Sequence, residues 1–173
     1  MTAAKTQIKQ LALLAILTAM AVALRIAHII PVPNMQPVTD IIMIVTLQLG
    51  LGFGLSMAVL VMVISNIFLG FGIWTIGQIA AYAVCVLVVY LFGKIPLVRK
   101  HFWLQLIVAT LLGYVYGLIV NFSMSIWGGI PAFIAYTAGS FVFDTYHCIG
   151  NFIFYPILYK PLTIALDRYE KRI

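Results

Sequence analysis

Long runs of apolar residues make up most of the chain, and short stretches rich in proline, glycine or charge interrupt them. A helix needs about 20 mainly apolar residues to cross a membrane. The runs that these stretches separate are residues 8–30, 38–49, 51–69, 74–92, 102–125 and 138–165. The pattern predicts an all-α membrane protein, a bundle of six transmembrane helices that forms a single domain over residues 1–173.

One of these segments is too short to cross a membrane alone. At 1.5 Å per residue, residues 38–49 would span roughly 18 Å of a hydrocarbon core of about 30 Å. It follows the proline-rich stretch 31–37, and the glycine-rich stretch 50–54 turns the chain into the next segment. We therefore expect flanking residues to extend this helix if it crosses the membrane.

Composition agrees with a membrane protein. The chain is 64% hydrophobic and 8% charged, with a mean hydropathy of +1.14, whereas a soluble domain carries about 25% charged residues. The net charge of +6 does not indicate nucleic-acid binding, because the basic residues lie in short terminal and connecting segments. The two cysteines, Cys85 and Cys148, lie in apolar runs and predict core positions rather than a disulfide framework or a metal site.

The basic residues predict the orientation. Six spans place nine of the ten lysines and arginines on one side, which the positive-inside rule makes cytoplasmic together with both termini. These nine are Lys5, Lys9, Lys94, Arg99, Lys100, Lys160, Arg168, Lys171 and Arg172. The outward connections, 31–38, 70–73 and 126–137, contain no basic residue, and Arg25 is the exception to the rule.

The first segment carries a stripe of small residues. Ala15, Ala19, Ala23 and Ala27 recur at a spacing of four, so they share one helix face. Small side chains allow helix backbones to approach closely in lipid. The stripe is therefore either a docking face for a partner membrane protein or a packing face inside the bundle.

Polar residues gather at the outward ends of the segments. The first outward loop offers the amides of Asn34 and Gln36 on a stretch that three prolines make rigid. This loop is expected to present amides to a ligand; alternatively it is a connection in which Thr39 or Asp40 caps the next helix. Further candidates for binding a solute at the outward ends are Asn66, Trp74, Tyr116 and Asn121. An interfacial aromatic belt is the alternative for the aromatic ones.

The last segment adds three polar residues on one face. Asp144, His147 and Asn151 follow the spacing i, i+3, i+7. Ionisable residues within a span tend to face a cavity or a partner, so these three are candidate ligand contacts. The alternative is a structural cluster in which Asp144 pairs with Arg25. A metal site is not expected, because His147 has no second histidine or cysteine at matching depth.

No catalytic motif stands out. The serines lie outside any nucleophile turn of the form G-x-S-x-G, and no phosphate-binding loop is present in the sequence, so no cofactor is expected in this chain. An intramembrane enzyme that uses Asp144 and His147 as acid and base remains a rival hypothesis.

Taken together, these residues resemble a known family. The chain length, the six spans, the alanine stripe and the polar outward ends are similar to the substrate-binding S components of energy-coupling factor (ECF) vitamin transporters. Four motifs look most like the cobalamin-type S component: residues 33–39, residues 65–70 with Trp74-Thr75, residues 114–117 with Asn121, and Phe143-Asp144 with His147 and Gly150-Asn151.

The resemblance implies a prokaryotic, multi-pass protein of the cell membrane. Such a subunit would bind a vitamin from outside and would associate with a transmembrane scaffold (T) subunit and two ATP-binding subunits. It would contact membrane lipid and topple in the membrane, and ATP hydrolysis by the partners would drive release inside. The docking motif would map onto Ala15, Ala19 and Ala23. Cobalamin is the first expectation for the vitamin, with pantothenate, hydroxymethylpyrimidine or a queuosine precursor as alternatives.

Overall fold

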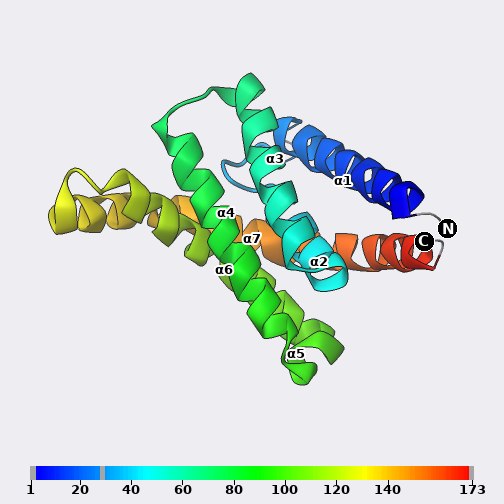
Figure 1. The fold of residues 1–173 in the computed structure, drawn as a ribbon. Coiled ribbons are helices and arrows are strands. Elements are labelled where there is room, and N and C mark those ends of the chain that lie inside the picture. The colour runs from blue at the N-terminus through cyan, green and yellow to red at the C-terminus, as the bar shows by residue number, and fades with distance from the viewer. Residues whose placement is uncertain (1–2, 28–29, 172–173) are drawn as a thin grey trace.

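The computed structural model describes residues 3–27 and 30–171, and within this part of the chain every regular element is a helix (Figure 1). Five helices are long and apolar enough to cross a membrane. The elements are α1 (Ala3–Ile26), α2 (Val38–Leu49), α3 (Leu51–Leu69), α4 (Ile73–Gly93), α5 (Pro96–Lys100), α6 (Phe102–Met124) and α7 (Gly129–Glu170).

The short helix α2 lies at the centre of the bundle. Its residues 38–46 are all buried, and it contacts α1, α3, α4, α6 and α7. A helix that is apolar on all sides is stable only when other elements enclose it. The expected short segment is therefore present with the expected bounds, but it serves as a core rather than as a sixth full-length span.

The last helix differs most from the sequence prediction. The expected outward loop 126–137 is wrong, because α7 begins at Gly129 and continues for 42 residues, roughly 63 Å at 1.5 Å per residue. Pro131 does not prevent this, since the first turn of a helix has no hydrogen-bond partner for its N–H groups and tolerates proline. The first segment also ends earlier than expected, at Ile26, and residues 28–29 lie outside the described residues.

Helices α6 and α7 pack closely along a glycine seam. A Cβ atom on Gly113 would lie 2.7 Å from the backbone nitrogen of Cys148, and one on Gly117 would meet the carboxyl group of Asp144. A Gly-x-x-x-Gly pattern lets two helix backbones approach in this way. The seam fixes the rotation of α7 and buries its polar residues against α6.

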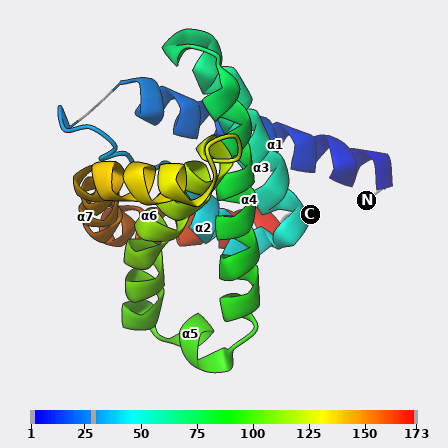
Figure 2. The same ribbon diagram turned by 90° about the vertical axis from the view of Figure 1, so that its left-hand side faces the viewer.

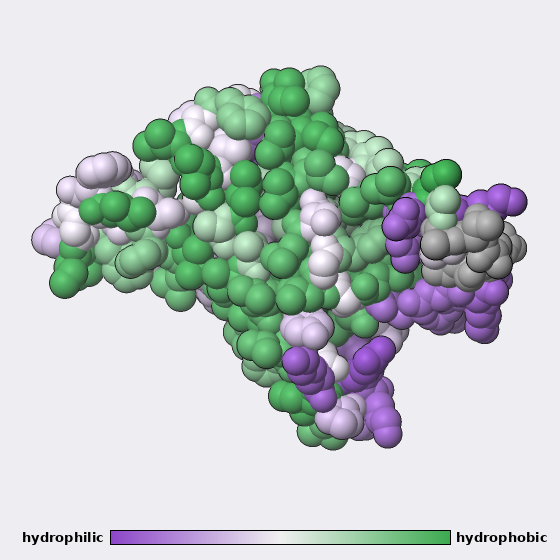
Figure 3. Space-filling model, viewed as in Figure 1, coloured by the Kyte–Doolittle hydropathy of each residue, from purple (hydrophilic) through white to green (hydrophobic). Residues whose placement is uncertain are grey.

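The ends of the bundle differ in polarity. The two described chain ends lie close together at one side, and α5 lies at the lower end of the α4–α6 pair (Figures 1 and 2). Strongly hydrophilic surface gathers around these two places, whereas the α3–α4 connection and the tip formed by α6 and α7 are mostly apolar or weakly polar (Figure 3). The described basic residues other than Arg25 lie near the two chain ends, in α5, or at the end of α4 that precedes it. Arg172 lies outside the described residues, and the orientation of these ends in the membrane stays a prediction.

Candidate functional site

A polar cavity of about 220 Å³ lies beneath the segment that joins α1 to α2. We call it the loop cavity. Its lining combines three amide side chains, one guanidinium, one phenol and several apolar groups. The lining residues are Arg25, Val32, Asn34, Met35, Gln36, Leu69, Gln78, Tyr116, Val120 and Phe143. Five helices (α1, α3, α4, α6 and α7) and one loop thus contribute to a single site.

The loop over this cavity has a defined turn. The backbone N–H of Met35 donates to the carbonyl of Val32 at 3.3 Å, and Asn34 has a φ of 64°. Proline followed by a residue with positive φ is the signature of a type II turn, and asparagine tolerates that conformation better than most residues. Asn34 therefore has a conformational role as well as a side chain that reaches the cavity.

Two contacts attach the loop to α7. The amide of Asn34 donates to the carbonyl of Phe143 at 3.3 Å. About two turns further along α7, a Cβ atom on Gly150 would lie 3.1 Å from Cα of Met35, so the loop backbone rests directly on the helix there. The loop covers the cavity because α7 supports it at both points.

Arg25 is buried and belongs to a hydrogen-bond network that joins α1, α3 and α4. Its Nη1 donates to Oδ1 of Asn66 at 2.8 Å and to the hydroxyl of Ser65, while its Nε has no hydrogen-bond partner within the described residues. The amide of Asn66 in turn donates to Oε1 of Gln78 at 2.8 Å and to Oγ1 of Thr75 at 2.9 Å. Asn66 therefore lies behind the lining and orients Arg25 and Gln78.

His147 supports the wall that Tyr116 forms. Its Nε2 lies 2.6 Å from Oγ1 of Thr39, and its ring meets that of Tyr116 edge-on, with centroids 5.1 Å apart. The ring of Tyr82 lies 4.7 Å from Tyr116 on another side. His147 thus fixes Tyr116 without lining the cavity. Thr39 bonds this histidine, and α2 has no side-chain cap, so neither Thr39 nor Asp40 has the capping role that was the alternative.

Asp144 belongs to a separate polar chain. It accepts a hydrogen bond from Ser140 at 2.7 Å, and Ser140 accepts one from the amide of Asn121 at 2.7 Å. The suggested pairing of Asp144 with Arg25 is wrong, since Arg25 is bonded to α3 instead. Asn151 is fully buried and donates to the carbonyl of Ala109 at 2.8 Å. Asn121, Asp144 and Asn151 thus belong to hydrogen-bonded links between α6 and α7, and they do not line the loop cavity.

The aromatic candidates divide into two groups. Tyr116 is buried and lines the cavity. Trp74 is 44% exposed, packs over Gly72 and lies outside the cavity lining. Phe71 and Trp127 are exposed as well, which is typical of side chains at a membrane interface.

The alanine stripe lies on the outer face of α1. Ala15, Ala19, Ala23 and Ala27 are all exposed, whereas the helix buries Leu17, Ala21 and their neighbours against the bundle. Within the described residues the stripe therefore has no helix packed over it, and the alternative of packing inside this chain's own bundle lacks support.

Sequence reasoning gave too little weight to two cavity residues. Arg25 was noted as an exception to the charge rule, and Gln78 was not among the candidates, yet both line the loop cavity. A lone arginine near the outward end of a span was the available signal. Among the described residues, no group of three His, Cys, Asp or Glu side chains lies close enough to hold a metal ion.

Comparison with protein families gave one match. The model described as "ECF transporter, substrate-specific component" covers residues 9–159, which is most of the chain. The chain belongs to this family. No curated protein and no solved structure matched it significantly. S components are integral membrane proteins and subunits of transporters rather than enzymes, so the chain is a substrate-specific subunit of an ECF transporter. The intramembrane-enzyme hypothesis loses its basis.

Proposed function

We propose that this S component binds a small vitamin that carries a carboxylate, and that it does so in the loop cavity. The observation that supports this is the position of Arg25. Among the described residues that line the cavity it is the one charged side chain, and none of them is a carboxylate. A buried guanidinium is costly unless it is paired, and a ligand carboxylate is a partner that arginine binds with good geometry.

The rest of the lining suits a ligand with amide and hydroxyl groups. Asn34, Gln36 and Gln78 each offer both donors and an acceptor, and Tyr116 and Phe143 supply aromatic walls. Pockets for drug-sized ligands usually measure about 300–1,000 Å³, so a cavity of about 220 Å³ favours a small solute.

Of the vitamins that the sequence brought into consideration, pantothenate fits these properties best. It has one carboxylate, one amide and two hydroxyl groups. Hydroxymethylpyrimidine and the queuosine precursor are small but lack the carboxylate. Cobalamin is far larger than the cavity and would require the loop over residues 31–37 to move away from Phe143 and Gly150. Cobalamin remains the expectation from motif resemblance, and the cavity argues for the smaller alternative.

A matched pair of ligands tests the proposal. Panthenol has an alcohol in place of the carboxylate of pantothenate and is otherwise the same molecule. Isothermal titration of the purified protein should show that pantothenate binds at least tenfold more tightly than panthenol. The variant Arg25→Gln should bind the two about equally. Because the readout is a ratio within one variant, a general loss of stability does not imitate it. Tight cobalamin binding without discrimination between the other two would overturn the assignment.

Transport is proposed to need partner subunits. ECF S components associate with a T subunit and with ATP-binding subunits, and the exposed stripe of Ala15, Ala19 and Ala23 is the proposed contact with the T subunit. A face of methyl groups allows a second helix to approach closely. ATP hydrolysis in the partners would then drive release of the vitamin, and this chain itself would bind no nucleotide.

A further inference from the structure

A cavity larger than the loop cavity lies elsewhere in the molecule. A space of about 620 Å³ opens between the end of α2, the end of α4 and the short helix α5. We call it the basic cavity. It lies at the far end of α2 from the loop cavity, since Pro37 precedes that helix and Gly50 follows it. Membership of the family does not assign a ligand or a function to this cavity.

Three cations line this space, and none of the described residues in its lining is acidic. Lys94 caps the end of α4, and Arg99 and Lys100 occupy the last turn of α5. The Nζ of Lys94 lies 4.6 Å from the centre of the Tyr90 ring, which holds that side chain along the cavity wall. Three positive charges without a counter-charge in one hollow attract an anion.

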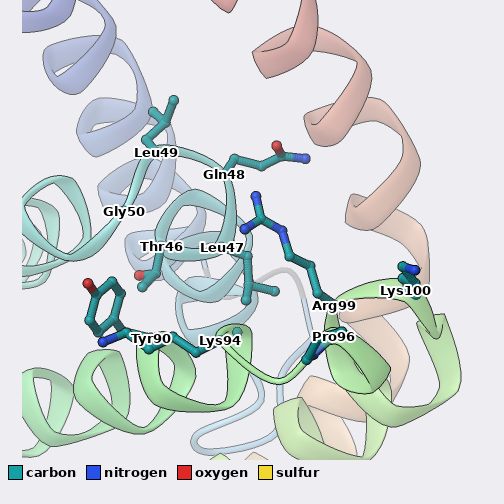
Figure 4. A pocket seen from close by; sticks show the side chains of 11 residues that line it. Thr46, Leu47, Gln48, Leu49, Gly50, Tyr90, Lys94, Pro96, Arg99 and Lys100 are labelled. Carbon is teal, nitrogen blue, oxygen red and sulfur yellow. The ribbon is translucent and has the colours of Figure 1, made fainter.

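Arg99 is placed to contact such an anion. Its side chain extends from α5 towards Gln48 of α2 (Figure 4), and it also lines a second small space beside Tyr155. The backbone carbonyl of Arg99 accepts a hydrogen bond from Gln105 at 2.9 Å, which fixes α5 against α6. Within the described residues the guanidinium itself makes no hydrogen bond or ion pair, so its donors are available to a ligand.

The surroundings point to a lipid rather than to a soluble anion. Leu97 of α5 and Trp103 at the start of α6 are 59% and 71% exposed next to these cations, and Leu47 and Leu49 line the cavity beside them. Exposed apolar side chains and tryptophan directly beside lysine and arginine are typical of the interface between lipid tails and headgroups. Basic pockets between helices at that depth bind the phosphate groups of anionic lipids.

We propose that the basic cavity binds the phosphate group of an anionic membrane lipid, with Arg99 and Lys94 as its principal contacts. The headgroup would fill the space between α2, α4 and α5, and the acyl chains would lie against the exposed apolar residues of α5 and α6. This site is independent of the vitamin and of its identity.

Binding of short-chain lipids to the full-length protein in detergent tests this. Native mass spectrometry should give a dissociation constant for dioctanoyl phosphatidylglycerol that is several-fold lower than that for dioctanoyl phosphatidylcholine. A basic residue near a membrane surface contributes about 1 kcal/mol to the binding of anionic lipid, which is roughly fivefold in affinity. Arg99→Gln and Lys94→Gln should therefore each weaken phosphatidylglycerol binding about fivefold.

Arg168→Gln is the matched control, because Arg168 is an exposed arginine in the last turn of α7 and lines neither cavity. It should leave lipid affinity within about twofold. Equal binding of the two lipids, or an equal loss in Arg168→Gln and Arg99→Gln, would overturn the proposal. Inorganic phosphate that protects the protein from thermal unfolding as well as the anionic lipid does would overturn the assignment to a lipid.

Discussion

The loop cavity and the basic cavity sit at the two ends of α2, and they hold their polar groups in opposite ways. Beside the loop cavity, the one side chain of Asn66 makes hydrogen bonds to Arg25, Thr75 and Gln78. Each of these polar side chains is therefore held in place by a neighbouring side chain. Around the basic cavity, Arg99 and Lys100 are exposed side chains on a helix of five residues. Fixed polar groups select one ligand shape, whereas long exposed cations attract any anion of suitable size.

This difference teaches how a small bundle can serve two requirements. The proposed vitamin site needs preorganised donors, and the buried network between α1, α3 and α4 would supply them. A surface that meets headgroups needs charge at the right depth more than exact geometry. If the two ends are independent in this way, a substitution at one end should leave binding at the other end unchanged.

The largest effect is expected from a change that touches neither cavity. Ala19→Trp places a bulky side chain on the exposed stripe of α1 and should abolish ATP-dependent uptake when the partner subunits are coexpressed, because the helices can no longer approach. Vitamin affinity of the isolated protein should stay within about twofold. Ala80→Trp, an equally exposed alanine on α4, is the control and should preserve uptake. Equal loss of uptake in both variants would remove the stripe from consideration as a docking face.

Arg25→Gln should have the next largest effect, and comparing it with Arg99→Gln shows which of the two cavities binds the vitamin. A hydrogen bond to a charged group contributes about 1.5–3 kcal/mol, so titration calorimetry should show pantothenate affinity reduced about 10- to 100-fold. Arg99→Gln changes the same charge at the other end of α2 and should leave that affinity unchanged within about twofold. A comparable loss in both variants would show that net charge, rather than the fixed network, governs vitamin binding.

Some features of these regions could be predicted from the sequence, and others depend on how the helices pack. The bounds of α2 follow from the prolines before it and the glycines after it, and the polarity of the ends follows from the basic residues. The early start of α7 does not follow, because Gly128, Gly129 and Pro131 together are equally typical of a loop. Which polar side chains line the cavity depends on helix rotation about the long axis, and packing decides that. Hence Arg25 lines it, and Asn121 and Asn151 do not.

The glycine seam that sets this rotation can be tested. Gly113→Ala should lower the stability of the protein by about 1–3 kcal/mol, because the added methyl group would meet the backbone of Cys148, which has little freedom to move. Gly139→Ala lies on the same α7 but faces open space and should be neutral or stabilise by about 0.5–1 kcal/mol. Thermal unfolding in detergent compares them. If Gly113→Ala is as stable as Gly139→Ala, the seam does not fix α7.

A smaller effect is expected at the turn of the loop. Asn34→Ala loses the side-chain amide and also forces alanine to a φ of 64°, so vitamin affinity should fall about tenfold. Asn34→Gly keeps the backbone conformation and loses only the amide, so its loss should be about threefold or less. Titration of both variants separates the two roles. Equal losses would assign the whole effect to the amide and would leave the turn without influence on binding.

The smallest effect is expected for Asp144→Asn, which keeps the shape of the side chain and removes its charge. Asp144 accepts one hydrogen bond from Ser140 and lies outside the lining of the loop cavity. An asparagine oxygen can accept the same bond, so vitamin affinity should change less than about twofold and stability by less than about 1 kcal/mol. Arg25 would be unaffected because its partners are Ser65 and Asn66. Calorimetry and thermal unfolding, with Arg25→Gln measured beside it, give both numbers. A tenfold loss of affinity in Asp144→Asn would mean that the vitamin reaches the Ser140–Asp144 chain, and the fixed site would then extend along α7 beyond the cavity described above.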